Sequence, residues 1–170
     1  MSNFKERISK FNHIIGNTPA TNVDAFWEQA KLQAALVLEE AQEQYDAVME
    51  RDLVELVDGA CDVQYLQTYL DEMIETIGVP LKVAMDMVVV NNDQKYTKHE
   101  SMAHISRMIH SDAGIPCYVE KVEFEGDTYY TVKRSSDGKV MKLKDHVSPN
   151  IRATIPDGVF AKYNQVVNVE

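Results

Sequence analysis

Apolar residues recur at helical spacing through the first half of the chain. They predict a first helix that ends near Gly16, because their positions share one helix face: Phe4, Ile8, Phe11 and Ile15. A second helix is expected to begin with Asp24 as its N-cap, and a third with Asp52. The third ends at Gly78, and a fourth continues to about Asn91. Short links between these helices favour an antiparallel bundle.

Beyond residue 113 the apolar positions alternate, which is typical of strands. Residues 118–124 and 128–132 alternate on either side of a turn at Glu125-Gly126-Asp127, and so predict a hairpin. The dipeptide Asp137-Gly138 predicts a second turn before a third strand at 139–142. A small antiparallel meander is therefore expected after the helices.

The fold class expected is mainly α, an antiparallel helix bundle with a small C-terminal antiparallel β appendage. At 170 residues the chain is long enough for a single domain with a core. The bundle is assigned to residues 1–112 and the appendage to 113–170. A short extra helix at 99–110, with Ser101 as its N-cap, completes the helical part. Its histidines are spaced too far apart for a helical metal pair and are expected at the surface: His99, His104 and His110.

Two of the predicted helices carry acidic residues in compact stripes. Each residue of a helix advances about 100°, so three acids on the second helix share a sector about 100° wide, and three on the third share one about 60° wide. These acids are Glu39, Glu40 and Glu43, then Glu55, Asp58 and Asp62. The first sector also holds Leu32, Leu36 and Ala47, while Gln33 and Gln44 point elsewhere, and the second continues into Leu66, Tyr69 and Met73. We therefore expect both stripes to face the core, with Asp62 the most enclosed acid of its stripe.

A metal site explains core-directed carboxylates better than a solvated charged face, which is the alternative. Carboxylates that face a bundle interior repel one another and lose hydration unless a cation neutralises them. No His lies between Val23 and Ile77, and an all-carboxylate set suits Mg²⁺, or Mn²⁺ as a substitute, rather than zinc or iron. Mg²⁺ held by such residues keeps open positions that substrate phosphates commonly fill. This chemistry indicates a nucleotide substrate.

The acidic segments resemble a known family. Glu39-Glu40-Ala41-Gln42-Glu43, followed by residues 55–65 (ELVDGACDVQY), is similar to the all-α nucleoside triphosphate pyrophosphohydrolases. These are the MazG-like and phosphoribosyl-ATP pyrophosphohydrolase-like proteins, whose compact forms are often phage-encoded. The resemblance implies Mg²⁺-dependent hydrolysis of a nucleoside triphosphate to monophosphate and pyrophosphate. It favours deoxynucleotides, purines slightly ahead, and a homodimer or homotetramer.

The same resemblance assigns roles to individual residues. Glu40, Glu43 and Asp62 are the implied metal ligands, with Asp58 or Glu55 completing the set. Glu39 is implied as a further ligand or as the group that orients the attacking water.

Polar residues after the fourth helix are the candidates for binding substrate. Asn92 and Lys95 match the Ser-Asn-x-x-Lys-like sequence that family members carry there, and Lys95 would offset triphosphate charge. An exposed polar helix end is the alternative interpretation. Residues 137–142 (DGKVMK) are similar to the tail of phage-type members, so Lys139 and Lys142 are expected to offset phosphate charge as well.

Composition narrows the classes of partner. A net charge of −10 argues against nucleic-acid binding through a basic surface, and the run Met87–Val90 is too short to span a membrane. Without a signal-peptide pattern, cytoplasmic residence is expected. Trp27 is expected in the core, and Cys61 is expected within a helix as a small apolar residue. The rival interpretation to an enzyme is a non-catalytic helical module that binds a nucleotide or a protein.

Overall fold

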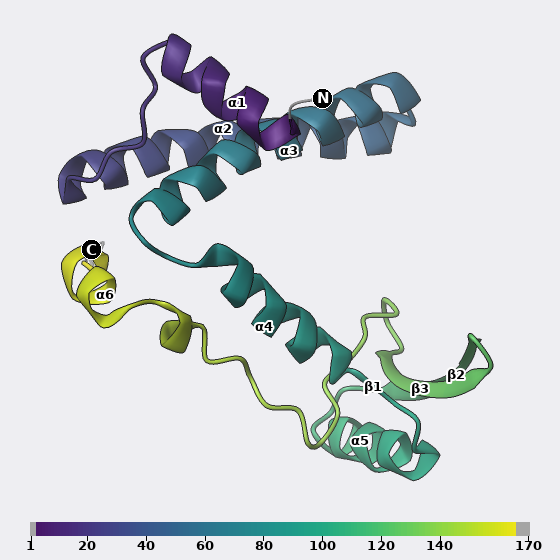
Figure 1. The fold of residues 1–170 in the computed structure, drawn as a ribbon. Coiled ribbons are helices and arrows are strands. Elements are labelled where there is room, and N and C mark those ends of the chain that lie inside the picture. Colours follow the sequence, from purple (N-terminus) through teal and green to yellow (C-terminus); the bar gives the residue numbers. More distant parts are fainter. Residues whose placement is uncertain (1–2, 166–170) are drawn as a thin grey trace. The chain divides into compact units, whose positions relative to one another are not determined.

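The computed structural model describes residues 3–165 as parts of two compact units (Figure 1). The first unit comprises the chain up to Leu81 and again from Ala153, and the second comprises Lys82–Arg152. The prediction that the whole chain is one domain remains a prediction. The division expected at residue 113 differs from this one, since two helices before it belong with the sheet.

The first unit is built on a long helical hairpin. Helix α2 (Val23–Glu50) and helix α3 (Leu53–Thr76) pack against each other, with α1 (Phe4–Ile14) on α3 and the short α6 (Asp157–Tyr163) in the same unit. The hairpin turns sharply because Arg51 ends α2 in the left-handed region, at φ 62°, and Asp52 caps α3. The Asp52 carboxylate accepts hydrogen bonds from the backbone amides of Val54 and Glu55, at 2.9 and 3.1 Å.

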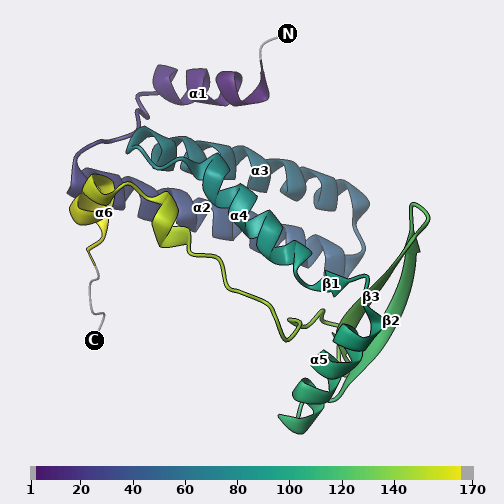
Figure 2. The same ribbon diagram turned by 60° about the horizontal axis from the view of Figure 1, so that its bottom comes forward.

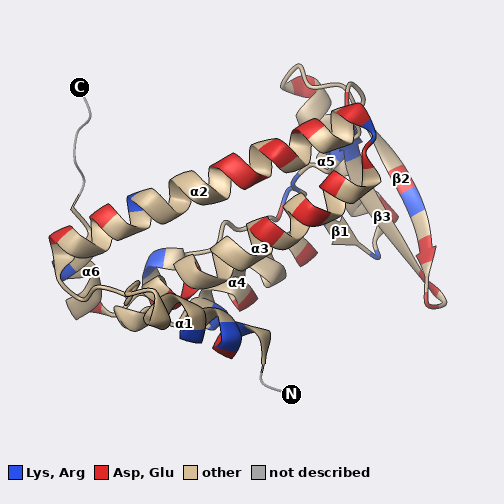
Figure 3. Cartoon of the chain, turned by 90° about the horizontal axis from the view of Figure 1, so that it is seen from above, with Lys and Arg blue, Asp and Glu red and all other residues tan. Residues whose placement is uncertain are grey.

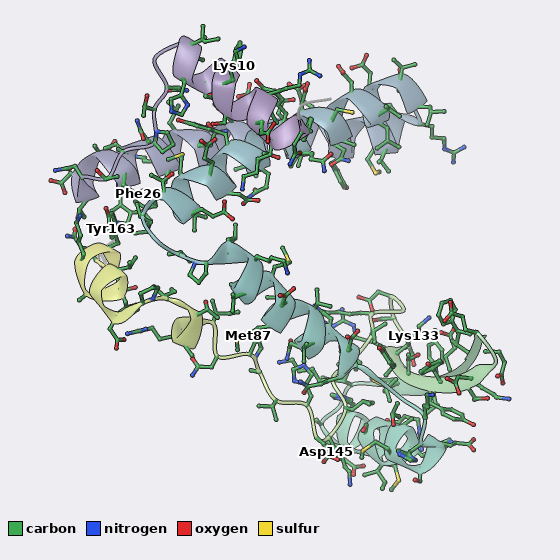
Figure 4. The ribbon with its side chains drawn as sticks, viewed as in Figure 1. Lys10, Phe26, Met87, Lys133, Asp145 and Tyr163 are labelled. Atoms are coloured by element: carbon green, nitrogen blue, oxygen red, sulfur yellow. The ribbon has the colours of Figure 1, made fainter. Side chains whose placement is uncertain are left out.

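The core of this unit joins all four helices. Its buried side chains are Ile8, Phe26, Tyr69, Met73 and Tyr163. The ring of Phe26 meets the rings of Trp27 and Tyr163 edge to face, at centroid distances of 5.2 and 5.3 Å (Figure 4). Trp27 donates from Nε1 to the Tyr163 carbonyl at 3.0 Å, which fastens α6 to the start of α2. Trp27 is nevertheless 46% exposed, so its predicted place in the core was wrong.

The second unit is a helix-backed sheet. It contains α4 (Leu81–Asp93), β1 (Tyr96–Thr97), α5 (Glu100–Asp112), β2 (Cys117–Phe124) and β3 (Asp127–Arg134). The strands are antiparallel in the order β1-β3-β2, and α5 packs on one face (Figure 2). The core under α5 consists of Ala103, Cys117, Val132 and Leu143. A 3₁₀ turn, Ile151–Thr154, stands where the chain returns to the first unit.

The fold class is confirmed as mainly α with a small antiparallel sheet. Three local predictions were wrong. Asn22, not Asp24, caps α2, because its side chain accepts from two backbone amides of the first turn, and α5 begins at Glu100 rather than after Ser101. The third strand is Tyr96–Thr97 rather than 139–142; Val140 makes only an isolated bridge to Lys133.

No helix among residues 3–165 combines the length and apolar character that a membrane span requires.

Tyr163→Ala should lower the free energy of unfolding by about 3 kcal/mol or more, because it removes a buried ring from the core. It also removes the hydroxyl that donates to the Thr21 carbonyl at 2.5 Å. Chemical denaturation followed by Trp27 fluorescence measures the change. Tyr118→Ala is the control, since Tyr118 is 43% exposed and should cost under about 1 kcal/mol. Equal losses in the two variants would contradict the role given to α6.

Candidate functional site

The candidate site is organised around a close approach of α2 and α3 at Gly59 and Gln44. Gly59 of α3 is buried, and a Cβ added to it would lie 3.0 Å from the Cβ and 3.1 Å from the Cα of Gln44 on α2. A side chain at this position would therefore require the backbone of Gln44 to move by a few tenths of an ångström. The contact sets Asp58 and Asp62, on the turns around Gly59, against the α2 turns that carry Glu40 and Glu43.

A seven-residue repeat along α2 explains which acid lies inward. Phe26, Gln33 and Ala47 are buried, and half-buried Glu40 occupies the missing position of the series. Residues seven apart return to nearly the same face of a helix, so Glu40 lies on the seam between α2 and α3. Glu39 and Glu43 lie beside the seam and are exposed.

The charges around Glu40 come from both helices. Desolvation raises the pKa of the Glu40 carboxyl above its usual value, and the negative charges of Glu43, Asp62, Glu39 and Asp58 raise it further. Two of these four carboxylates belong to α3, so the acidic stripes of the two helices act on one another. The predicted proximity of the stripes is thus supported by the field at Glu40.

The α3 acids are less enclosed than expected. Glu55, Asp58 and Asp62 are all exposed, so the expectation that their stripe faces the core was wrong for the single chain. The reason is that α3 meets α2 through buried Gly59, with Val63 and Leu66 half-buried next to it on the same face. On a helix the three acids lie to one side of this row, where they flank the seam.

The α2 face was also misassigned in part. Gln33 is buried and donates from Nε2 to the Leu66 carbonyl at 2.9 Å, although it was expected to point elsewhere. Gln44 is half-buried at the Gly59 contact, whereas Leu32 is 64% exposed. The seam therefore runs about one residue away from the sector that the apolar spacing indicated. Cys61, expected as a packed residue, is exposed.

The six acids gather on adjoining parts of α2 and α3 (Figure 3). None of the six forms an ion pair with a Lys, Arg or His among the described residues, although seven other acids elsewhere do. Within residues 3–165, no three His, Cys, Asp or Glu side chains converge closely enough to hold a metal ion. The donor set is carboxylate only and bears no neutralising partner, which fits a hard cation such as Mg²⁺.

The candidate substrate-binding residues lie in the second unit. At the end of α4, Lys95 donates from Nζ to the Asn92 side-chain oxygen at 2.7 Å, and Asn92 donates to the Val88 carbonyl at 2.9 Å. Lys142 donates to the Ser148 hydroxyl at 3.5 Å, and the Lys139 side chain is exposed. The structure pairs Asn92 with Lys95, and it fixes no relation between these residues and the acids.

Three contacts that sequence reasoning missed hold the chain after Lys142 against the end of α4 and the residue that follows it. Asn91 donates to the Val147 carbonyl at 2.7 Å and lies 3.1 Å from His146 Nε2, while Gln94 accepts from the Val147 amide at 2.9 Å. No periodic pattern in the sequence predicts these contacts. The buried Gly59 was missed too, although a glycine inside a strong helical pattern was its available signal.

A comparison with protein families places this architecture. The family model described as phosphoribosyl-ATP pyrophosphohydrolase matches residues 4–89, which contain α1, α2, α3 and most of α4. The chain belongs to this family, within the MazG-like all-α nucleoside triphosphate pyrophosphohydrolase superfamily. Family members are pyrophosphohydrolases, so the general reaction type is that of a hydrolase. No curated protein and no solved structure matches the chain.

Gly59→Ala should destabilise the protein by about 1–3 kcal/mol, because the added methyl overlaps the backbone of Gln44. The loss should appear even though alanine favours a helix over glycine by about 1 kcal/mol. Gly158→Ala in α6 is the matched control, since no atom lies within 4 Å of its added Cβ. Urea denaturation should show this control unchanged or slightly stabilised; destabilisation of both variants by the same amount would contradict the close helix contact.

Glu40→Gln should stabilise the metal-free protein at pH 7. Because the folded-state pKa of Glu40 is raised, the charged form that prevails above that pKa weakens the folded state, and the amide removes this cost. The gain should shrink as the pH falls through the raised pKa, where Glu40 is already neutral. Thermal melts between pH 4 and pH 7 test this, with exposed Glu50→Gln as control. A gain that is independent of pH would contradict the assigned cause.

Proposed function

We propose that this protein hydrolyses a nucleoside triphosphate, with deoxynucleotides favoured, to the monophosphate and pyrophosphate in a Mg²⁺-dependent reaction. The observation that carries the proposal is the unpaired acidic cluster at the Gly59 contact, with the raised pKa of Glu40 at its centre. Repulsion among these carboxylates lowers the free energy of unfolding, and a bound cation would offset that loss.

The proposed ligands are Glu40, Glu43, Asp58 and Asp62, with Glu55 as the alternative to Asp58. Glu40 and Glu43 lie on α2, and Asp58 and Asp62 lie on α3 beside the Gly59 contact. Bound Mg²⁺ supplies Lewis-acid polarisation of the phosphate and lowers the pKa of a coordinated water. Mn²⁺ would substitute, since it accepts the same oxygen donors.

The protein's own groups would then position the reactants. Glu39, exposed beside the seam, would either complete the metal site or orient the water that attacks the α-phosphorus. Lys95, Lys139 and Lys142, with Asn92, would offset and hold the phosphate chain, as in phosphoryl-transfer sites generally. The composition of the second unit supports this role. Residues Lys82–Arg152 include 11 Lys and Arg and 10 Asp and Glu, whereas the rest of the chain includes 6 Lys and Arg and 17 Asp and Glu.

A homodimer or homotetramer forms part of the proposal. Near the hairpin turn, large apolar side chains stand exposed on both helices: Leu38, Tyr45, Val48, Met49, Leu53, Val54 and Val57. Apolar patches of this extent usually mark a contact surface. A second copy covering them would also desolvate the neighbouring acids and so strengthen cation binding. The reaction is assigned to the cytoplasm.

The decisive experiment combines product analysis with an acid substitution. Purified protein with Mg²⁺ and a panel of triphosphates should release monophosphate and pyrophosphate in equal amounts, and EDTA should abolish turnover. Asp62→Asn, which keeps size but removes a ligand charge, should lower turnover by more than about a hundredfold. Glu50→Gln, at the end of α2 and outside the cluster, is the control and should leave turnover unchanged.

Chromatography separates the alternatives. Diphosphate and orthophosphate as products would reassign the enzyme to γ-phosphate cleavage. Binding of a triphosphate without turnover under any metal would favour the non-catalytic helical module instead.

A further inference from the structure

The sheet of the second unit presents an apolar face that α5 does not cover. Side chains alternate along a strand, so Val132 packs under α5 while Thr131 and Tyr129 belong to the opposite face. The register places Tyr96 of β1 beside Thr131, and Val122 of β2 beside Tyr129. Together with Phe124, these residues line a cavity of about 330 Å³. This volume lies at the lower end of the range for small-molecule sites, which is roughly 300–1,000 Å³.

Two tyrosine rings form a right-angled corner in this cavity. The centroids of Tyr96 and Tyr129 are 5.5 Å apart and their planes meet at 88°. A hydrogen bond to Asp93 raises the pKa of the Tyr96 hydroxyl, and Tyr129 donates from its hydroxyl to Asp127 at 3.4 Å. Both rings are therefore held by their outer ends. A flat ring that stacks on one of them would meet the other at its edge, the arrangement that aromatic groups prefer.

The polar groups of the cavity select for a neutral ligand. At the rim, Lys98 pairs with Asp127 at 2.5 Å and lies 5.4 Å from the centroid of the Tyr129 ring. Because Asp93 adds a second carboxylate, the rim groups carry a net negative charge. A phosphate would be repelled there, whereas an uncharged heterocycle would not.

We propose that this cavity binds a nucleobase, which would stack in the Tyr96–Tyr129 corner. Base stacking on aromatic side chains tolerates different bases. The choice of a nucleobase among flat heterocycles rests on the proposed function. All five lining residues lie beyond residue 89, so the site belongs to the part of the chain outside the family match.

Saturation-transfer NMR on the full chain in EDTA tests the proposal without requiring hydrolysis. Four uncharged nucleosides serve as probes: adenosine, guanosine, cytidine and thymidine. Saturation should reach the base protons more strongly than the sugar protons. Tyr129→Leu, which keeps apolar bulk but removes the ring, should raise the dissociation constant about tenfold or more.

Matched variants distinguish a specific site from non-specific binding of nucleosides to exposed apolar side chains. Tyr118→Leu changes another exposed tyrosine of the same sheet that does not line the cavity, and it should leave binding unchanged. The proposal is overturned if no nucleoside binds at about 10 mM, if Tyr118→Leu weakens binding as much as Tyr129→Leu, or if inorganic tripolyphosphate displaces the nucleoside.

The base could belong to the hydrolysed substrate or to a second nucleotide, and kinetics distinguishes them. If it is the substrate's, nucleosides inhibit competitively and Tyr129→Leu raises KM with little change in kcat. If it is a second nucleotide's, inhibition or activation is not competitive and KM for the substrate is kept. Either pattern supports the base site. Because binding is measured in EDTA, a lack of hydrolysis would contradict the proposed function but would not contradict the base site.

Discussion

The approach of α3 to the backbone of α2 at Gly59 and Gln44 is the constraint on which the first unit depends. A side chain at Gly59 would have to displace the backbone of Gln44 by a few tenths of an ångström, and the part-buried hydrogen bond from Gln33 to the Leu66 carbonyl joins the same two helices. The same separation fixes how strongly the acids of one helix act on those of the other. Packing and electrostatics are therefore set by the absence of one methyl group. The acidic cluster is tolerated because its outer members remain hydrated, while Glu40 alone is drawn into the seam.

Much of the fold could be predicted from periodicity, since the helices and the hairpin β2–β3 are long enough to show their own repeat. The third strand could not. Tyr96–Thr97 is two residues long, and its structure follows from pairing with Thr131 and Tyr130 across the free edge of β3. A pattern that short contains no period, and the segment at 139–142 offered a more regular one.

The sequence was sufficient to predict which helices carry the candidate site, but not which of its acidic side chains are exposed. Angular spacing groups Glu39, Glu40 and Glu43 correctly, but it does not say which edge of the group meets α3. Gly59 determines that edge, because it has no side chain and so allows α3 to approach the backbone of α2 there. The capping of α2 by Asn22 instead of Asp24 failed in the same way, because both residue types favour the cap and only the fold decides between them.

The chain leaves the first unit at Leu81 and returns to it at Ala153, so the second unit is an insertion within the first. During translation, Met73 of the core is made 90 residues before Tyr163. At about 5–20 residues per second, the ribosome would hold an unfinished helical hairpin for roughly 5 to 18 seconds. The inserted unit has its own sheet and core and can fold in that interval. The second unit is therefore synthesised completely before α6, the last helix of the first unit.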